Sequence, residues 1–495
     1  KMYFQAILDY NRIFKEVHDL NIMFLYNQEQ YDINGPTTLF SSLPQRKQGV
    51  AGRVSYSYDG RYYIEGNFGY NGSENFAKGH RFGFFPSIAV GYNISNEKFW
   101  QPIKPVISNL KIRGSWGLVG NDATNAGRFA YMEDLVLGGS DSYTTGIRQD
   151  TYYSGPSWNR YFNPDLTWEV GEKINLGLDL QLFNDFNLTF DIFREKRRDI
   201  FMTRENSIPE IVGTGETKIT SNNGEMENKG LDLAIDYNKQ ITKDFFLSFK
   251  STLTFARNKV LKMDEPPYFE YPGLSDVGHP LGTYWGYVAD GLFPDQETID
   301  NSPRQDLGYT PQPGDIKYVN QPNAKGEYDN VINSNDRVAI GHPYDPELVY
   351  GFGPSMKWKN WDFSFFFQGV ARTSFMMYGM HPFGTTSIKN MLQFVADDHW
   401  SVDNPNPNAA YPRLTKDSNG NNDQYSTYWL RNAAFLKLKN AEIGYTYKGM
   451  RFYLSGVNLL TFSPFKHWDP EMGGGNGLYY PTQRVFNIGF QMTIQ

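Results

Sequence analysis

The feature that most constrains this chain is the strict alternation of apolar and polar residues, which recurs along most of its 495 residues. In residues 230–238, leucine, isoleucine or tyrosine occupies every second position, and aspartate, alanine or asparagine stands between them. The same pattern runs through residues 174–182, 245–255 and 486–494. A period of two indicates β-strands that have one apolar face and one polar face.

About fifteen such strands can be placed along the chain. We predict them at residues 2–14, 18–31, 48–58, 62–71, 83–95, 109–119, 167–182, 186–199, 226–239, 244–258, 349–359, 361–373, 432–447, 451–462 and 484–495. Several are longer than an ordinary globular strand. Their length suits strands that cross a membrane at a tilt.

The connections between these strands alternate between short and long. The short ones are residues 59–61, 184–185, 359–360 and 448–450, with slightly longer ones at 15–17, 96–108 and 240–243. The long ones are 32–47, 72–82, 120–166, 200–225, 259–348, 374–431 and 463–483. Outer-membrane barrels have short periplasmic turns and long extracellular loops, whereas a soluble sandwich has no reason to keep its long loops at one end. The predicted fold class is therefore all-β, a transmembrane antiparallel β-barrel.

The loop pattern also orients the chain. With the long loops outside, the first and last strands both run toward the periplasm, so the number of strands is odd. Because bacterial single-chain barrels have an even number, we expect residues 1–495 to be the C-terminal portion of a larger barrel, with an odd number of strands before Lys1. The polar strand faces are expected to line a wet lumen, with Arg113, Asp179, Asp191, Asp232, Asp236 and Lys250 among them.

Composition excludes several classes of protein. Aromatic residues make up 16% of the chain and glycine occurs 47 times, which favours strands over a helical bundle. The net charge of −7 argues against a general nucleic-acid binder. Cysteine is absent, and the histidines show no metal-binding spacing. We therefore expect no enzyme activity, no cofactor and no metal site.

Several blocks of sequence resemble one family in their order along the chain. They are residues 52–95 (beginning GRVSYSYDG), 108–122 (SNLKIRGSWGLVGND), 277–293 (VGHPLGTYWGYVADGLF), 313–320 (PGDIKYVN), 335–370, 411–414 (YPRL), 429–447 (WLRNAAFLKLKNAEIGYTY), 452–462 (FYLSGVNLLTF) and 469–471 (DPE). Together they resemble the C-terminal barrel of SusC-like (SusC/RagA) TonB-dependent transporters of the outer membrane of Bacteroidetes-type bacteria. The resemblance covers nearly the whole chain, with long loops at 120–166, 259–348 and 374–431.

This resemblance implies a barrel of roughly 22 strands with a plugged lumen, so about seven strands and the plug would precede Lys1. It implies import of a large nutrient, and we expect a glycan rather than an oligopeptide. It also implies a SusD-like lipoprotein lid, energy from TonB delivered through the upstream region, contact with outer-membrane lipid, and pairing of two transporter–lid units.

Aromatic residues in the long loops are the candidate ligand-binding groups, because flat aromatic faces suit sugar rings or apolar peptide side chains. The candidate site residues are Tyr284, Trp285, Tyr287, Trp400, Tyr411, Arg413, Trp429 and Trp468. The alternative is that they hold the loops together, and that Arg413 and Asp469 form bonds within loops. Residues 320–337 occupy the place of an Asp-rich family loop, and Asn323, Asp329, Asn333 and Asp336 could coordinate an ion there. With so few carboxylates, we expect a plain surface loop instead.

Two other functions stay open at this point. One is a siderophore- or vitamin-type TonB-dependent receptor without a lid, against which the blocks at 277–293 and 335–370 speak. The other is a soluble β-rich carbohydrate-binding protein or enzyme, whose leucine-rich strand faces would have to pack on another sheet.

Overall fold

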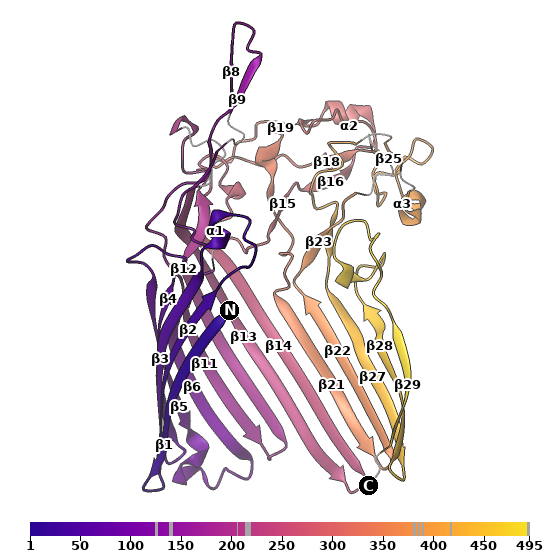
Figure 1. The fold of residues 1–495 in the computed structure, drawn as a ribbon. Helices are drawn as coiled ribbons and strands as arrows, with labels where there is room; N and C mark the ends of the chain where they lie inside the picture. The colour runs from indigo at the N-terminus through magenta and orange to yellow at the C-terminus, as the bar shows by residue number, and fades with distance from the viewer. Residues whose placement is uncertain are drawn as a thin grey trace. The chain divides into compact units, whose positions relative to one another are not determined.

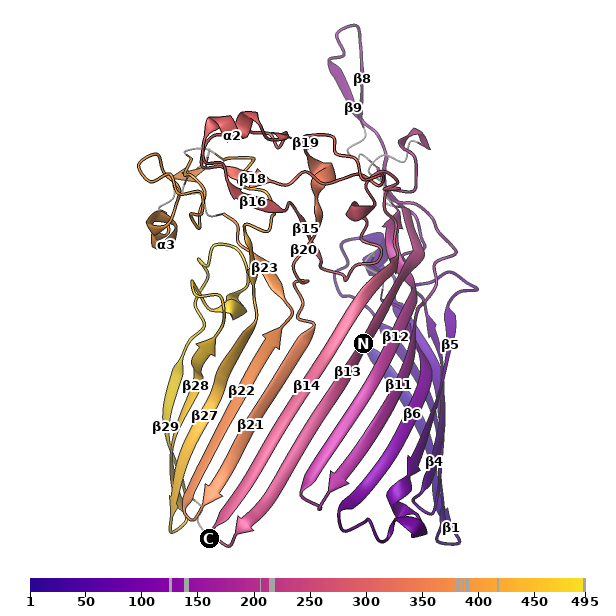
Figure 2. The same ribbon diagram turned by 180° about the vertical axis from the view of Figure 1, so that it is seen from behind.

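The protein is described by a computed structural model that covers residues 1–123, 127–137, 142–204, 206–212, 219–379, 383–384, 387–388, 391–415 and 418–492. It divides into two compact units, Lys1–Leu231 with Asn258–Pro266, and Asp232–Arg257 with Pro267–Gln495. Figures 1 and 2 show the elements of both units from opposite sides. None of the helices in the described ranges is long and apolar enough to span a membrane.

The long strands form a 15-stranded antiparallel sheet in which each strand pairs with its neighbours in chain order. They are β1 (Met2–Phe14), β2 (His18–Tyr31), β3 (Gln45–Tyr58), β4 (Tyr62–Ser73), β5 (Phe82–Asn93), β6 (Ile107–Asn121), β11 (Glu169–Leu182), β12 (Phe186–Arg204), β13 (Ile219–Thr242), β14 (Phe245–Lys262), β21 (Leu348–Trp358), β22 (Trp361–Ala371), β27 (Phe435–Tyr447), β28 (Met450–Phe462) and β29 (Val485–Met492). All the predicted long strands are confirmed, and residues 493–495 of the last one lie outside the described residues.

The main difference from the predicted boundaries lies in two strands. β12 continues to Arg204 and β13 already begins at Ile219, beyond the predicted limits of 199 and 226. The added residues include the polar run Ser221-Asn222-Asn223, which interrupts the alternation. Asn222 donates hydrogen bonds to the carbonyls of Thr167 and Asp199, so contacts with other segments hold these residues in place where their own pattern does not.

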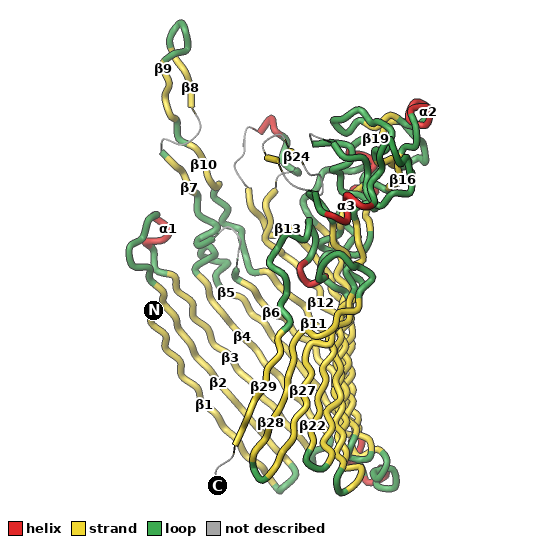
Figure 3. Tube along the Cα trace, turned by 90° about the vertical axis from the view of Figure 1, so that its right-hand side faces the viewer, coloured by secondary structure: helices red, strands yellow, loops and turns green. Residues whose placement is uncertain are grey.

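The short connections turn as the sequence predicts. Asp59 and Gly60 both have positive φ (52° and 60°), the conformation that tight hairpin turns between twisted strands require. Lys448 and Gly449 repeat it at the β27–β28 turn, with φ of 46° and 80°. Figure 3 shows these turns as short green links between long yellow strands, with the longer loops at the opposite strand ends.

The two faces of the sheet differ as predicted. On β11 and β12, Leu176 pairs with Ile192 and Leu178 with Phe190, yet Leu176 is 56% exposed and Ile192 50%. The cost of leaving such side chains in water is about 25 cal/mol per Å² of apolar surface, so this face requires apolar surroundings.

The polar face carries ion pairs between neighbouring strands. Arg113 contacts Asp179 and Asp191 at 3.2 and 2.6 Å in the first unit. In the second unit, Lys250 lies 3.7 Å from Asp236, and Thr254 donates a hydrogen bond to Asp232. The charged residues predicted for the polar face therefore compensate one another there.

The long loops contain structure that the alternation does not predict, because strands of two to four residues are too short to show a period. The short strands are β7 (Asp134–Val136), β8 (Ser142–Thr145), β9 (Thr151–Ser154), β10 (Ser157–Arg160), β15 (Tyr284–Gly286), β16 (Ala289–Leu292), β17 (Arg304–Gln305), β18 (Ile316–Tyr318), β19 (Val331–Ile332), β20 (Val338–Ile340), β23 (Ser374–Met376), β24 (Phe383–Gly384), β25 (Ser387–Ile388) and β26 (Leu430–Asn432). The α-helices are α1 (Leu39–Ser42), α2 (Gln296–Asp300) and α3 (Gln393–Asp397).

Three loops of the second unit share one hydrophobic core. We call them loop A (residues 267–347), loop B (372–434) and loop C (463–484). Their common core contains Ile316 from loop A, Phe375 and Trp429 from loop B, and Phe465 from loop C, each less than a tenth exposed. The three loops therefore pack as a single body, and this body carries the candidate site.

Candidate functional site

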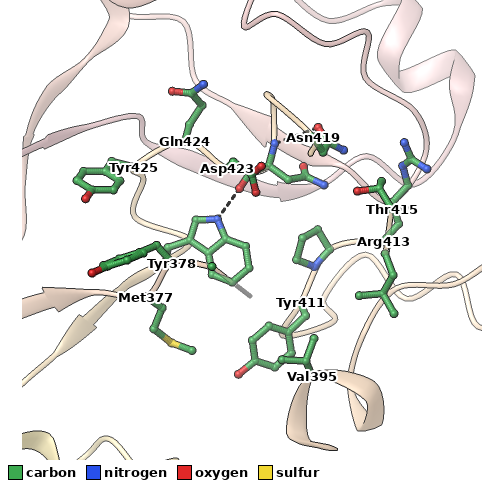
Figure 4. Close-up of a pocket in the computed structure, with 15 residues that line it drawn as sticks. Met377, Tyr378, Val395, Tyr411, Arg413, Thr415, Asn419, Asp423, Gln424 and Tyr425 are labelled. Carbon is green, nitrogen blue, oxygen red and sulfur yellow. Dashed lines mark hydrogen bonds between the residues drawn. The ribbon is translucent and has the colours of Figure 1, made fainter. Parts of the chain in front are cut away.

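Two neighbouring pockets lie in this loop body. The first has a volume of about 150 Å³ and is shown in Figure 4; it is lined by Met377, Tyr378, Gly379, Val395, Tyr411, Pro412, Arg413, Leu414, Thr415, Asn419, Asn422, Asp423, Gln424, Tyr425 and Trp429. The second has a volume of about 270 Å³ and is lined by Tyr284, Tyr344, Met376, Tyr378, Tyr425, Met472, Gly473, Gly474 and Tyr479. Tyr378 and Tyr425 belong to both walls, so the pockets form one tyrosine-rich site.

Backbone contacts between loops hold these two tyrosines. The Tyr378 N–H donates to the Gly475 carbonyl at 3.1 Å, which joins loop B to loop C. The Tyr425 carbonyl accepts from the Tyr287 N–H at 2.9 Å, which joins loop B to loop A. A side chain at Gly286 would come within 2.4 Å of that carbonyl, so glycine is required for the approach. The site is thus preorganised by its backbone.

Two tyrosine hydroxyls of the second pocket, those of Tyr284 and Tyr378, have raised pKa values and stay protonated at neutral pH. Burial raises the pKa of Tyr284 to about 12. A hydrogen bond with Tyr479 raises the pKa of Tyr378. Every residue that lines the second pocket is uncharged. The hydroxyls can donate and accept hydrogen bonds while their rings offer flat apolar faces, a combination suited to a neutral ligand.

A buried carboxylate holds one wall of the first pocket. Asp315 is 0% exposed and accepts hydrogen bonds from Arg413 Nε at 2.7 Å and from the side chains of Asn419 and Asn422, both at 2.9 Å. Its other oxygen accepts from the Gln312 N–H at 2.8 Å. The carboxylate of Asp315 therefore compensates the positive charge of Arg413. The cation fixes loop B on loop A.

Aromatic rings pack beneath the first pocket. Tyr411 is 2% exposed, and its hydroxyl lies 3.3 Å from His467 Nε2. The His467 ring stacks on Phe394 at 4.2 Å, and burial lowers the pKa of this histidine. The indole of Trp429 donates to the Asn422 carbonyl at 2.7 Å. Figure 4 shows Tyr411 and Val395 on the side of the pocket opposite Asn419 and Asp423.

An ionic cluster ties loop C to the sheet. Lys437 of β27 is 0% exposed and places Nζ 2.6 Å from Asp469 and 2.5 Å from Glu471. Lys439 adds a contact of 3.0 Å to Glu471. Asp469 therefore bonds within the protein. The cluster fixes the segment that leads into Gly473 and Gly474 of the second pocket.

The structure gathers only part of the predicted site set. Tyr411, Arg413 and Trp429 line the first pocket, and Tyr284 lines the second. The other four lie elsewhere in the loop body: Trp285 donates to Asp276 at 2.6 Å, Tyr287 packs 5.2 Å from Tyr318, Trp400 covers Gly314, and Trp468 packs 4.5 Å from Phe465 and donates to the Gly473 carbonyl. Their roles in the structure are to pack the loops.

Sequence reasoning missed Tyr344, Tyr378, Tyr425 and Tyr479, which complete the walls of the second pocket. Tyr425 stands four residues before the predicted Trp429, and Tyr479 is half of a tyrosine doublet. Local aromatic density could have found these two. Tyr344 and Tyr378 carry no such signal, because only the packing of loops A, B and C brings them together.

The loop at residues 320–337 uses its oxygens internally. The carboxylate of Asp336 accepts from the Gln321 and Asn333 N–H groups at 2.7 and 2.8 Å, and burial raises the pKa of Asp336. Asn323 accepts from the N–H groups of Lys325 and Glu327. Across the described ranges, no three His, Asp or Glu side chains gather in a way that could hold a metal ion. The geometry is that of a self-bonded surface loop.

Comparison with known proteins gives consistent matches along the chain. Residues 3–459 match the family model described as TonB dependent receptor-like, beta-barrel. TonB-dependent receptor P3 of Formosa agariphila is 27% identical over 478 residues, which are 90% of this chain and 45% of that protein. TonB-dependent receptor SusC of Bacteroides thetaiotaomicron is 29% identical over 468 residues, 89% of this chain and 43% of that protein. The chain thus spans less than half the length of these relatives.

Solved structures share the fold. The RagAB peptide importer in its open-open state superposes with a TM-score of 0.77 at 20% identity, covering 99% of this chain and 54% of that one. The structure of the RagAB peptide transporter gives a TM-score of 0.75 at 21% identity, covering 99% and 55%. At such identity the likeness establishes the architecture alone.

Proposed function

Because the chain belongs to the TonB-dependent receptor-like β-barrel family, with SusC among its relatives, we propose that it forms the barrel and outer loops of a transporter that imports a large nutrient. The protein is an outer-membrane β-barrel of the SusC type. In this proposal TonB supplies the energy through upstream parts of the transporter, and residues 1–495 are its C-terminal portion. The substrate crosses the membrane chemically unchanged.

The proposed substrate is an oligosaccharide. The observation that carries this choice is the tyrosine-rich lining of the two pockets, which is uncharged throughout the second pocket. The first pocket adds the carboxamides of Asn419, Asn422 and Gln424; its charged lining residues are Asp423 and Arg413, and Arg413 is bonded to Asp315. Sugar rings stack on aromatic faces, and their hydroxyls exchange hydrogen bonds with tyrosine and amide groups. An oligopeptide is the second candidate, because the solved structural relatives are described as peptide transporters. Peptides with charged side chains or termini would find no compensating charge in the lining of the second pocket.

The proposed partner is a SusD-like lipoprotein that covers the loops. Large apolar side chains stand exposed on loops A and C, including Phe269 at 87%, Leu478 at 68% and Tyr480 at 80%. A partner that covers these loops would remove such apolar side chains from water, which favours association. Pairing of two such transporter–lid units is part of the same proposal. A receptor without a lid would leave these side chains in water.

Substitution of the shared tyrosines tests the ligand site. We expect Tyr378→Ala and Tyr425→Ala each to weaken oligosaccharide binding about tenfold, because each removes one face and one hydroxyl from both pockets, worth about 1.4 kcal/mol. Binding is measured by calorimetry on the transporter purified from outer membranes, against a panel of neutral oligosaccharides and neutral oligopeptides. Tyr328→Ala is the matched control, since Tyr328 is an exposed tyrosine of the same loop body and lies outside both linings.

The panel also decides between the substrates. The proposal is supported if oligosaccharides bind, both tyrosine variants weaken that binding, and Tyr328→Ala leaves it unchanged. If oligopeptides bind instead and both tyrosine variants weaken that binding, the substrate is the second candidate, an oligopeptide. If wild type and both tyrosine variants bind every tested ligand with equal affinity, the two pockets do not recognise the ligand.

A further inference from the structure

A third pocket lies in the first unit, at the upper ends of β2 to β5. It has a volume of about 160 Å³, and its walls include Gln28, Arg46, Gln48, Arg81 and Phe82. We call it the rim pocket. It is remote in sequence from loops A, B and C, and none of its residues belongs to the tyrosine-rich site.

The strand register places one wall of the rim pocket on the apolar side of the sheet, whereas Lys47 and Ser73, which pair with each other, alternate with this wall. Gln28 pairs with Gln48, Gln48 with Gly72, and Gly72 with Phe82. Side chains two residues apart on a strand share a face. The next row on this face, one step toward the short turns, is Tyr26, Val50, Tyr70 and Phe84.

Nearer the short turns, the same face of the strands carries further apolar side chains. Ile22, Val54 and Ile88 are 38%, 48% and 46% exposed, and Phe84 is 58% exposed. Tyr70 and Phe82 stack with ring centroids 5.0 Å apart. Aromatic rings in such rows mark the interface between the bilayer core and the headgroups in outer-membrane barrels. The wall formed by Gln28, Gln48 and Phe82 therefore continues the aromatic row to the level expected for headgroups.

The charges around the rim pocket favour an anion, although the whole chain carries −7. Its lining contains three cations, Arg46, Lys47 and Arg81, against one carboxylate, Glu74. Lys47 is compensated by Asp122 at 2.6 Å, whereas Arg46 lies 3.8 Å from Glu74 and its side chain is 53% exposed. Arg81 donates Nε to the Phe76 carbonyl, and within the described ranges no carboxylate forms an ion pair with it.

We propose that the rim pocket binds the phosphate-bearing headgroup of an anionic lipid in the outer leaflet. The guanidinium groups of Arg46 and Arg81 supply paired N–H donors that match phosphate oxygens. The amides of Gln28 and Gln48 bond the polar atoms around the phosphate. Phe82 and the aromatic row beneath it contact the first part of the acyl chains. The bound lipid would anchor the barrel at the extracellular interface.

Native mass spectrometry of the detergent-purified transporter tests this proposal, with phosphatidic acid as the probe and phosphatidylcholine as the neutral comparison. We expect one phosphatidic acid to bind at least tenfold more tightly than phosphatidylcholine. The double variant Arg46→Gln/Arg81→Gln should lose that preference, and Arg46→Gln alone should reduce it about threefold. The exposed position of Arg46 keeps this single variant informative if the double variant folds poorly.

Arg53→Gln is the matched control, because Arg53 lies on the same strand, β3, with its side chain on the opposite face. It should bind phosphatidic acid as wild type does. Equal affinity for the two lipids, or an unchanged preference in the Arg46 and double variants, would overturn the proposal. Displacement of phosphatidic acid by equimolar inorganic phosphate would also overturn it, since the site would then recognise free phosphate rather than a lipid.

Discussion

Replacing Asp315 with alanine should detach loop B from loop A and destabilise the loop body by about 3–5 kcal/mol, the usual cost of removing one member of a buried charged pair. Asp315 is 0% exposed and accepts hydrogen bonds from Arg413, Asn419 and Asn422. Its removal leaves the Arg413 cation and two amides without their acceptor. Hydrogen exchange followed by mass spectrometry should show faster exchange in loops A and B, with the strands unchanged.

The control for this prediction is Asp306→Ala. Asp306 also pairs with an arginine of its own segment, but its side chain is 62% exposed, and exposed ion pairs contribute about 1 kcal/mol or less. If Asp315→Ala exchanged no faster than this control, the buried network would not be what holds the two loops together. Binding of the oligosaccharide should weaken in Asp315→Ala as well, because Arg413 and Asn419 form part of the pocket wall.

The second large effect is expected from Lys437→Met. This buried lysine contacts both Asp469 and Glu471, so its loss leaves two carboxylates side by side without their shared cation. We expect about 3 kcal/mol of local destabilisation in loop C. Limited proteolysis at neutral pH should cleave loop C in the variant and spare it in wild type. Lys439→Met should change little, since Lys439 is partly exposed and contacts only Glu471.

The same cluster predicts a pH dependence in the wild-type protein. Burial alone would raise the pKa of Asp469, but hydrogen bonds from Lys437 and Thr482 outweigh it and lower this pKa; Lys437 and Lys439 act likewise on Glu471. A lowered carboxylate pKa stabilises the folded loop above the unfolded-state pKa of about 4, and this stability is lost as the pH falls through the lowered values. Loop C should therefore become protease-sensitive in acid in wild type, whereas Lys437→Met is sensitive already at pH 7.

Most of the sheet could be predicted from the sequence because one face of each strand requires apolar surroundings and the other does not. Because of that requirement, apolar and polar residues alternate along strands such as β11, and tight turns such as Asp59-Gly60 mark the strand ends. The polar extension of β13 could not be found in this way, since its order comes from contacts such as those of Asn222 with neighbouring segments.

The candidate site was less predictable for a different reason. A loop aromatic that binds ligand and one that packs a loop have the same local sequence, so Tyr411 and Trp400 are indistinguishable before folding. For Arg413 the sequence left open whether it contacts ligand or bonds within the loops, because its carboxylate partner Asp315 lies 98 residues earlier in the chain. The sharing of Tyr378 and Tyr425 by two pockets depends on how three loops pack, which alternation does not encode.

The measurement that tests the central claim most directly is isolation of the protein from native outer membranes. The membranes are extracted with detergent, the chain is captured, and the proteins that accompany it are identified by mass spectrometry. The account predicts that it is found in the outer-membrane fraction with a SusD-like lipoprotein in comparable amount. Recovery from the soluble fraction would contradict the membrane-barrel assignment, and recovery from the outer membrane without any lipoprotein would contradict the proposed lid.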